Sequence, residues 1–433
     1  MILPFRLGAH VERAVLIPGC RFVRPRGVAL VVLAVAACGT EAPGEDDDPS
    51  SSGTFMQRDS AGVVIATTLG EAAWAVLDWE VDSLPDLDIG SGESEQQTLF
   101  QVEGVRGLTE GGVAVVDGGS REIRYYDPQG QPLYNVGGEG EGPGEFRQPV
   151  YVLEAGSDSL LFWDRRLRRF QLFSEDGRFH RTVTVSDRRA ISGLIPIGAA
   201  GPRILLRDWE PSGMIQAGIH GVRGTLEEGW HLIWFDPSTG GQVSAAHLSF
   251  STLHGVPEGA VDIPFTIPPS VAVNRKGVFL TDGRPPEIQD IGTEGRLRRI
   301  FRVEGPLRPV TNEIKESDLK RRMDETPWGL WSDWFAEMDL PDSLPVFESL
   351  QIDDIGWLWA KVYHPNPTQS PEWMVFDPDG RAHGVLQAPD GLEIHHIGTD
   401  FILGVWHDEL GVEFVHRHIL RRRVVGPTHP GLN

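Results

Sequence analysis

A short repeat built around a glycine turn constrains the fold of this chain more than any other feature of its sequence. Each copy reads as an apolar strand, a connection, a second strand with alternating apolar residues, a tight turn and a third strand. The clearest copy is residues 112–136 (GVAVVDGGSREIRYYDPQGQPLYNV), which turns at residues 127–130 (DPQG). Further copies occupy residues 160–185, 230–250, 277–303 and 356–387, and the turn glycines are Gly130, Gly177, Gly240, Gly295 and Gly380.

The spacing of these glycines indicates the fold class. Successive turn glycines are 47, 63, 55 and 85 residues apart. The shortest spacing matches one four-stranded blade of a β-propeller, roughly 40–50 residues, and the longer ones require insertions. A sixth set of strands is expected near residues 393–397, 401–406 and 412–420, without a fourth strand. We therefore predict an all-β, six-bladed β-propeller over residues 61–422, with seven blades as the rival count.

The sixth blade needs one strand from elsewhere in the chain. Residues 62–67 (GVVIAT) are apolar, β-branched and outside every repeat. We expect this N-terminal strand to close the last blade, because closure protects sheet edges that would otherwise pair with other chains.

The longest spacing contains a helical pattern before the fifth blade. In residues 311–323, Thr311 is a capping residue and an acidic residue follows in the first turn. A second helix over residues 328–338 would place Trp331, Phe335 and Met338 on one face. We predict a helical insert at about residues 308–345. It would pack against the propeller or, alternatively, cover one mouth of its central channel.

The N-terminus has the pattern of a bacterial lipoprotein signal. A basic cluster at residues 21–26 precedes the apolar run of residues 27–37, which is about half the ~20 residues that a helix needs to cross a bilayer. The run ends in residues 35–38 (VAAC), which resemble a lipobox. We predict a signal peptide over residues 1–37 and lipidation of Cys38.

The residues after Cys38 predict a tether to a membrane. Residues 38–60 begin with an acidic, Ser-, Gly- and Pro-rich stretch that is too polar to fold, and residues 423–433 read as a C-terminal tail. Because Gly39, not Asp, follows the cysteine, resemblance to diderm lipoproteins indicates the outer membrane, facing the periplasm or the exterior. Cys20 and Cys38 are the two cysteines, so the body of the chain has no disulfide.

The charge of the chain argues against anionic partners. The formal net charge is −23 at pH 7, and the negative field of such a chain repels nucleic acid and anionic lipid head groups. We therefore expect a protein, peptide or glycan partner in the envelope, with the membrane contacted through the lipid anchor.

The segment of residues 137–149 (GGEGEGPGEFRQP), together with the VVDGGSREIRYYD stretch before it, resembles the linker and blade core of NHL-repeat propellers. It is also similar to a group of six-bladed propeller lipoproteins from soil and sediment bacteria, and this resemblance spans roughly residues 60–420. The resemblance implies the fold and says little about function, since propellers host enzymes, scaffolds and binding modules alike. A phosphate-binding reading of the glycines is excluded because Glu139, Glu141 and Glu145 would repel phosphate.

The resemblance to propeller enzymes implies two alternative metal sites. An NHL-like lyase holds zinc through histidines of several blades, and His416 and His418 alternate along one expected strand so that both face the same side. Lactonase-like propellers hold calcium through acidic residues at the channel mouth. The repeated acids Asp117, Asp164 and Asp282 fit a turn-capping role better. We therefore expect no cofactor, with zinc at His416 and His418, or calcium, as the weaker alternative.

The candidate ligand-binding residues are basic and aromatic. Arg165 and Arg166 belong to the densest basic cluster, and Arg147 lies in a predicted inter-blade loop. Trp328 and Trp331 would offer an aromatic surface for a sugar or peptide. The alternatives are that the arginines tie neighbouring loops together and that the tryptophans pack inside the insert.

These observations predict a membrane-anchored envelope lipoprotein that acts as a binding or scaffold module through its propeller loops. The alternative is a metal-dependent lyase or a lactonase-like enzyme whose site lies at the channel mouth. A ring of polar residues from at least three blades would favour the enzyme, and an apolar or plugged channel would favour the binding module.

Overall fold

The computed structural model describes residues 54–92, 97–156, 158–186, 194–211, 223–256, 259–305, 307–325, 331–366 and 369–423. The expected signal peptide, Cys38, most of the expected tether and the C-terminal tail lie outside these residues. Strands dominate the described part of the chain, and they form six separate sheets of four to six strands each.

The first three sheets follow one another along the chain. The first sheet contains β5 (Val102–Gly107), β6 (Val113–Asp117), β7 (Glu122–Tyr126) and β8 (Pro132–Gly137). The second contains β9 (Pro149–Glu154), β10 (Ser159–Asp164), β11 (Arg169–Ser174) and β12 (Phe179–Thr184). The third contains β13 (Ile195–Ala200), β14 (Arg203–Pro211), β15 (Gly224–Phe235), β16 (Gln242–Val256) and β17 (Gly259–Asp262).

Two of the remaining three sheets also receive strands from the N-terminal part of the chain. The fourth contains β18 (Ser270–Asn274), β19 (Gly277–Thr281), β20 (Glu287–Gly292) and β21 (Leu297–Val303), extended by β2 (Val63–Thr68) and β1 (Phe55–Ser60). The fifth contains β22 (Phe347–Ile352), β23 (Leu358–Val362), β24 (Glu372–Phe376) and β25 (Ala382–Gln387). The sixth contains β26 (Glu393–Ile397), β27 (Phe401–His407) and β28 (Glu413–Arg422), with β3 (Trp79–Val81) and β4 (Leu87–Ile89) along β28.

All five turn glycines of the repeat lie between the third and fourth strands of the first five sheets. Their φ angles, between 72° and 89°, fall in the left-handed region that glycine adopts without steric cost. Gly380 has a second constraint, because a Cβ added there would overlap the ring of Phe301 from the neighbouring sheet. The glycines that mark the repeat in the sequence are therefore required by the backbone of these turns.

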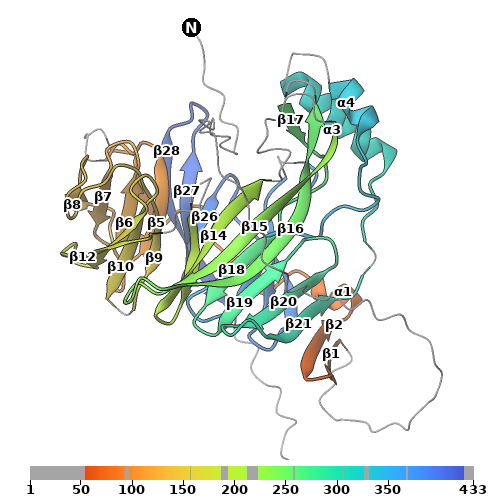
Figure 1. Ribbon diagram of the computed structural model, residues 1–433, viewed down its shortest axis with the longest axis horizontal. Coiled ribbons are helices and arrows are strands. Elements are labelled where there is room, and N and C mark those ends of the chain that lie inside the picture. Colours follow the sequence, from red (N-terminus) through yellow and green to blue (C-terminus); the bar gives the residue numbers. More distant parts are fainter. Residues whose placement is uncertain are drawn as a thin grey trace, which may run out of the picture. The chain divides into compact units, whose positions relative to one another are not determined.

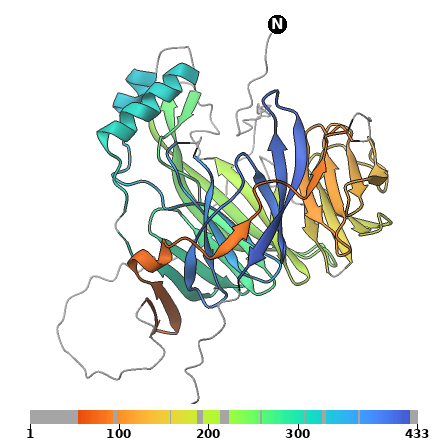
Figure 2. The same cartoon turned by 180° about the vertical axis from the view of Figure 1, so that it is seen from behind.

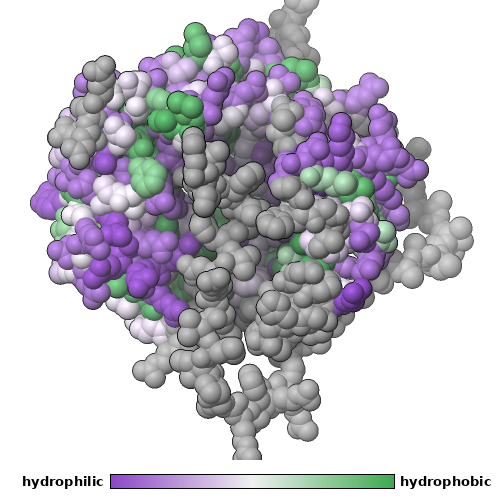
Figure 3. Space-filling model, turned by 90° about the horizontal axis from the view of Figure 1, so that it is seen from above, coloured by the Kyte–Doolittle hydropathy of each residue, from purple (hydrophilic) through white to green (hydrophobic). Residues whose placement is uncertain are grey.

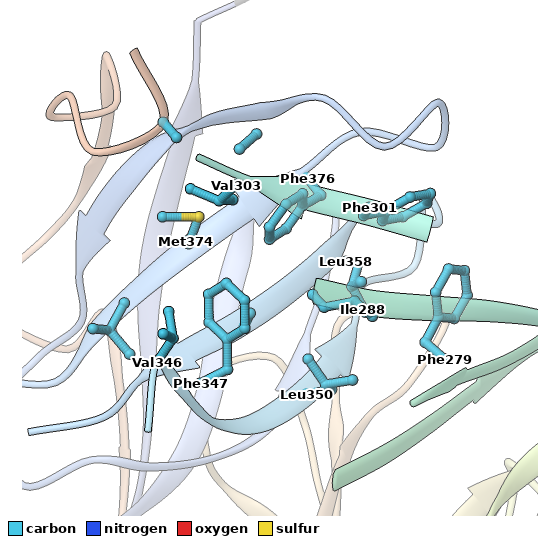
Figure 4. Close-up of a cluster of buried hydrophobic side chains, with 14 of the residues drawn as sticks. Phe279, Ile288, Phe301, Val303, Val346, Phe347, Leu350, Leu358, Met374 and Phe376 are labelled. Carbon is cyan, nitrogen blue, oxygen red and sulfur yellow. The ribbon is translucent and has the colours of Figure 1, made fainter. Parts of the chain in front are cut away.

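Six hydrophobic clusters join the sheets into a closed ring. Each cluster takes buried side chains from two neighbouring sheets, and the last one joins the sixth sheet to the first. In ring order the two sides contribute, among others, Ile123 and Phe162, Trp163 and Phe235, Trp230 and Val278, Phe301 and Phe376, Trp373 and Ile402, and Val405 and Val115. Figure 4 shows the cluster between the fourth and fifth sheets, where Phe301 stacks on Phe376 at 6.1 Å. This arrangement of small sheets is propeller-like.

The strand that completes the sixth sheet is not the one expected from the sequence. Residues 62–67 were predicted to fill this place, but β2 pairs in parallel with β21 of the fourth sheet. The short strands β3 and β4 pair with β28 instead, and Figure 2 shows this N-terminal segment (orange) reaching the last strands (blue). The apolar pattern of β2 made it a good strand, because Ala66 is fully buried, but a pattern does not specify the partner of a strand.

The expected tether over residues 38–60 is also too long at its C-terminal end. Residues 55–60 form β1, which pairs antiparallel with β2 in register from Phe55–Thr68 to Ser60–Val63. The side chains of β1 are mostly exposed. This explains why composition alone placed the segment with the polar tether: its order comes from backbone pairing with β2.

Two helices lie between β21 and β22, in the region where the sequence predicts helical structure. They are α3 (Asn312–Glu325) and α4 (Trp331–Glu337), and the Thr311 hydroxyl accepts a bond from the backbone N–H of Ile314 at the start of α3. Figure 1 shows them beside the start of β15, the end of β16 and the short strand β17. Arg223, directly before β15, pairs there with Glu337 of α4 at 3.3 Å. The short helix α1 (Gly70–Ala73) follows β2. Within the described ranges, none of the helices has the length and apolar character needed to cross a membrane.

Candidate functional site

A cavity of about 1650 Å³ lies where the six sheets meet. The first strand of every sheet contributes to its wall: β5, β9, β13, β18, β22 and β26. The connections that follow these strands frame one end, among them those at Ala155, Gly201, Lys276 and Ile355. The cavity is therefore the central channel of the ring. The outer surface is mostly hydrophilic in the view of Figure 3, with scattered hydrophobic residues.

Four charged side chains and one histidine, from five sheets, are linked across this cavity. Arg106 of β5 donates through Nη2 to Glu154 Oε2 at 2.9 Å and to Asp354 Oδ1 at 3.1 Å. Glu154, at the end of β9, also accepts from Arg275 at 3.3 Å, and Asp354 is bonded to His396 of β26. We call Arg106, Glu154, Arg275, Asp354 and His396 the cavity network. With a neutral His396 its two cations and two anions balance.

His396 is the buried end of the cavity network. Its Nδ1 accepts the backbone N–H of Gly107 at 3.0 Å, which leaves Nε2 to donate to the Asp354 carboxylate at 2.9 Å. Burial lowers the pKa of His396 below its ordinary value, and the charge of Arg106 lowers it further, although the Asp354 bond acts in the opposite direction. His396 is therefore a neutral imidazole with both nitrogens engaged, and it positions Asp354.

Asp354 is held as a carboxylate by its partners. Burial would raise its pKa, but the hydrogen bonds from His396 and Arg106 and the charge of Arg106 outweigh burial and lower it. The backbone N–H of Asp354 donates to the carbonyl of Ile397 at 3.1 Å, so the backbone is tied to the sixth sheet as well. The carboxylate thus has a fixed position at the junction of the fifth, sixth and first sheets.

The arginines predicted to bind a ligand lie outside the cavity lining. Arg147 forms ion pairs with Glu139 at 3.0 Å and Glu141 at 3.4 Å within its own linker. Arg166 is exposed and Arg165 is half-buried. Arg169 donates to the carbonyls of Glu141, Gly142 and Glu145. Of the two readings, the contacts of Arg147 and Arg169 match the one in which the arginines tie loops together.

The tryptophans of the helical segment do not form an exposed platform where the structure describes them. Trp331 is only 8% exposed, and its ring meets Trp334 edge-on at 5.5 Å. The guanidinium of Arg322 lies 4.8 Å from the centre of the same ring. Trp331 therefore packs between α3 and α4, as in the alternative in which the tryptophans pack inside the insert. Trp328 lies outside the described residues.

His416 and His418 lie on β28, where the N-terminal strands close the sixth sheet. Their rings are 6.0 Å apart, but His418 Nδ1 bonds to the carbonyl of Asp82 at 2.8 Å, and His416 stacks on Trp406 at 5.2 Å. Burial lowers the pKa of both histidines. Within the described residues, no group of three or more His, Cys, Asp or Glu is placed to hold a metal ion. Both histidines thus contact the closing segment or the core of their own sheet.

Two of the three repeated acids organise loops. Asp164 is fully buried and accepts the backbone N–H groups of Arg147 at 2.8 Å and Leu167 at 3.0 Å. Asp117 is equally buried, accepts the N–H of Ser120 at 2.8 Å and pairs with Arg124 at 3.1 Å. These contacts fit the capping role expected of them. Asp282 is exposed and accepts one backbone N–H, that of Arg284.

Sequence reasoning missed the cavity network entirely. The sequence pattern marks the repeat from its second strand onward, whereas Arg106, Glu154 and His396 lie on first strands and Asp354 is the second residue after one. Arg106 and Asp354 are 248 positions apart, and no motif links them. The one signal available was a charged or imidazole side chain at the end of several first strands, which an alignment of those strands would have shown.

No family model matches this sequence, and the search of curated proteins gave no match. A solved member of the DUF4221 family from Bacteroides vulgatus is 11% identical, with a TM-score of 0.48 over 80% of this chain and 99% of that chain. A candidate exported protein from Bacteroides fragilis is 10% identical, with a TM-score of 0.43 over 83% and 99%. Virginiamycin B lyase from Staphylococcus aureus is 10% identical, with a TM-score of 0.37 over 80% and 100%. These values are too low to transfer a site or a function.

Proposed function

We propose that this chain is an envelope-anchored binding protein, a six-bladed β-propeller that takes its ligand into the central cavity. The observation that carries the proposal is the cavity network, which places four charged side chains and His396, from five sheets, in one cavity of about 1650 Å³. The six sheets and the six clusters between them support the count of six blades.

The preorganisation and the size of the site support a binding function. Arg106, Asp354 and His396 are fixed by one another before any ligand arrives, which lowers the cost of ordering them on binding. The cavity exceeds the ~300–1,000 Å³ of small-molecule pockets, so it suits an extended ligand. The predicted criterion for an enzyme, polar residues from at least three blades, is met by this site. However, His396 has no free nitrogen to act as a base.

The location of the protein is a proposal from the sequence. A lipid on Cys38 would hold the chain on the outer membrane, and the acidic residues that follow would keep the propeller away from the surface. The ligand would then be a component of the envelope, a protein, peptide or glycan.

Native mass spectrometry tests the proposed cavity function. The full chain would be purified in mild detergent from the cells that make it, alongside Arg106→Glu and Arg178→Glu. Arg178 is the matched control because it is an arginine that is 73% exposed, pairs with Asp176 and lies outside the cavity lining. We expect a discrete co-purifying mass on the wild type and Arg178→Glu that Arg106→Glu lacks.

Two results would count against the proposal. A mass retained equally by Arg106→Glu places the ligand elsewhere, and the absence of any ligand mass on all three proteins contradicts binding in the cavity. Plasma mass spectrometry on the wild-type protein, purified without chelator, tests the enzyme alternative. One stoichiometric zinc or calcium ion per chain would favour a metal-dependent lyase or lactonase over the binding protein.

A further inference from the structure

Arg207 is a half-buried cation on β14, which runs beside β15 in Figure 1. Its guanidinium carbon lies 4.2 Å from the centre of the Trp230 ring, a cation–π contact between diagonal neighbours on one face of this strand pair. Burial lowers the pKa of Arg207, because the charged form loses hydration, and the phenol of Tyr151 acts in the opposite direction. Among the residues that the structure describes, none forms a hydrogen bond or an ion pair with this guanidinium.

Two other arginines that lie over tryptophan rings have the partner that Arg207 lacks. Arg322 and Arg422 are 4.8 Å and 4.9 Å from the centres of their rings. Each also pairs at 2.7 Å with a buried carboxylate, Asp318 and Asp353 respectively. Arg207 is closer to its ring than either, yet no described carboxylate pairs with it. Because a partly buried charge without a partner is costly, we expect the missing anion to come from a ligand.

The carboxylates that neighbour Arg207 on its own sheet are directed elsewhere. Glu228 of β15 accepts hydrogen bonds from Trp209 Nε1 at 3.2 Å and from the Thr252 hydroxyl at 2.6 Å. Asp208 is the next residue along β14, and successive side chains of a strand point to opposite faces. Neither carboxylate therefore compensates the charge of Arg207.

Tyr151 of β9 supplies a second free donor, close enough to affect the pKa of Arg207. It lines the central cavity, and its φ of 56° lies in the left-handed region, which is strained for a tyrosine. Strained residues of this kind concentrate at ligand sites. The Tyr151 hydroxyl has no hydrogen-bond partner among the described residues. Neither this oxygen nor the guanidinium nitrogens of Arg207 belong to the fully buried polar atoms without a partner, so both groups reach solvent.

We infer that Arg207 and Tyr151 form a binding site for one oxyanion group, a carboxylate or a phosphate, at the side of the central cavity. A guanidinium with all its N–H groups unused offers two parallel donors to such a group, and the phenol offers a third. Trp230 fixes the guanidinium, since it is 7% exposed and Phe250 meets it edge-on at 5.3 Å. The net charge of −23 on the chain disfavours a polyanion. The site shares no residue with the cavity network, so it does not rest on the function proposed above.

Arginine-selective labelling of the full, detergent-purified chain with phenylglyoxal tests this inference, with the rate at each arginine read by peptide mass spectrometry. The probes are sodium acetate and inorganic phosphate, each compared with sodium chloride at the same ionic strength. We expect about 50 mM of a bound anion to slow labelling of Arg207 about threefold or more, as competition at a Kd of about 25 mM or tighter requires. Arg203 is the matched internal control, because it lies on the same strand, 5.2 Å from the centre of the Trp234 ring and about 13 Å along the strand from Arg207.

The two probes also separate the two sources of the anion. Protection by acetate alone assigns a carboxylate, and protection by phosphate alone assigns a phosphate. No protection of Arg207 by either anion, or equal protection of Arg203, overturns the site. An Arg207 that is not labelled in the chloride buffer overturns it as well, because its guanidinium would then not be free.

Tyr151→Phe tests the second donor, because it removes the hydroxyl and keeps the ring. We expect weaker protection of Arg207 in this variant, and unchanged protection overturns the assignment of Tyr151 to the site. Circular-dichroism melting shows whether the variant is folded. The function of the cavity is tested separately through Arg106→Glu, so failure of the Arg207 site leaves that proposal standing.

Discussion

The closure of the ring by β3 predicts a large cost for removing Trp79. This residue begins β3 and is 7% exposed. Its ring lies 5.1 Å from that of Trp357 and 6.0 Å from that of Trp359, both of the fifth sheet. The guanidinium of Arg422, from β28, lies 4.9 Å from its centre. Trp79 thus joins the fifth sheet, the sixth sheet and the N-terminal segment.

The magnitude follows from burial. Replacing a buried aromatic residue by alanine costs about 3–5 kcal/mol in free energy of unfolding, because the lost transfer free energy adds to the cavity left behind. The contact with Arg422 is part of this loss, at about 0.5–2 kcal/mol. The matched control is Trp74→Ala, because Trp74 is 40% exposed in the same segment and should cost about 1 kcal/mol or less.

Urea unfolding of the two variants, followed by tryptophan fluorescence and circular dichroism, measures this difference. We expect the Trp79→Ala midpoint to fall well below that of Trp74→Ala, with the slope of the transition unchanged. Equal midpoints would show that β3 contributes little to closure. In that case the sixth sheet would be held by β4 or by its cluster with the first sheet.

Three further predictions concern the turns, the cavity and the anchor. Gly380→Ala should lower the free energy of unfolding by about 3 kcal/mol, because φ is 89° and the added Cβ meets Phe301. Gly240→Ala, where φ is 72° and the space is open, should lower it by about 1 kcal/mol, and urea unfolding measures both values. Because the folded state lowers the pKa of His396, the unfolded chain binds a proton more readily, and the fold loses stability as the pH falls through the ordinary pKa of 6.5. His396→Asn should therefore show a smaller drop in melting temperature between about pH 7.5 and 5.5 than the wild type. An unchanged drop would contradict this assignment. Cys38→Ala should move the protein from the membrane to the soluble fraction on cell fractionation, and unchanged membrane association would refute the lipid anchor.

The repeated parts of the fold could be predicted from the sequence because they depend on local rules. A left-handed turn position selects glycine, and apolar strand patterns flank each of these glycines in the sequence, so the five turns could be located without the structure. The strands of the sixth sheet were also expected close to where β26, β27 and β28 lie. The two helices after β21 were expected from a capping threonine and a helical pattern in the same way.

The parts of the fold that could not be predicted are those that depend on contacts between segments far apart in the sequence. The choice between β2 and β3 as the closing strand depends on where the chain runs after α1, and β3 has only three residues. Adjacent charges in residues 165–169 predicted a binding site, yet Arg169 donates its hydrogen bonds to backbone carbonyls of the linker. For Arg169, the charge density along the sequence marks a structural contact with the linker.

The same reasoning links the site to the closure of the ring. The residues of the cavity network come from strands far apart in the chain, and only the ring brings Arg106 of the first sheet within 3.1 Å of Asp354 after β22. His396, which holds Asp354, lies in the sheet that β3 and β4 complete. A variant that loosens this closure, such as Trp79→Ala, should therefore reduce binding in the cavity although Trp79 lies outside its lining. If binding survives in a Trp79→Ala protein with a lowered unfolding midpoint, the network is held by its own bonds and by the remaining clusters, independently of closure by β3.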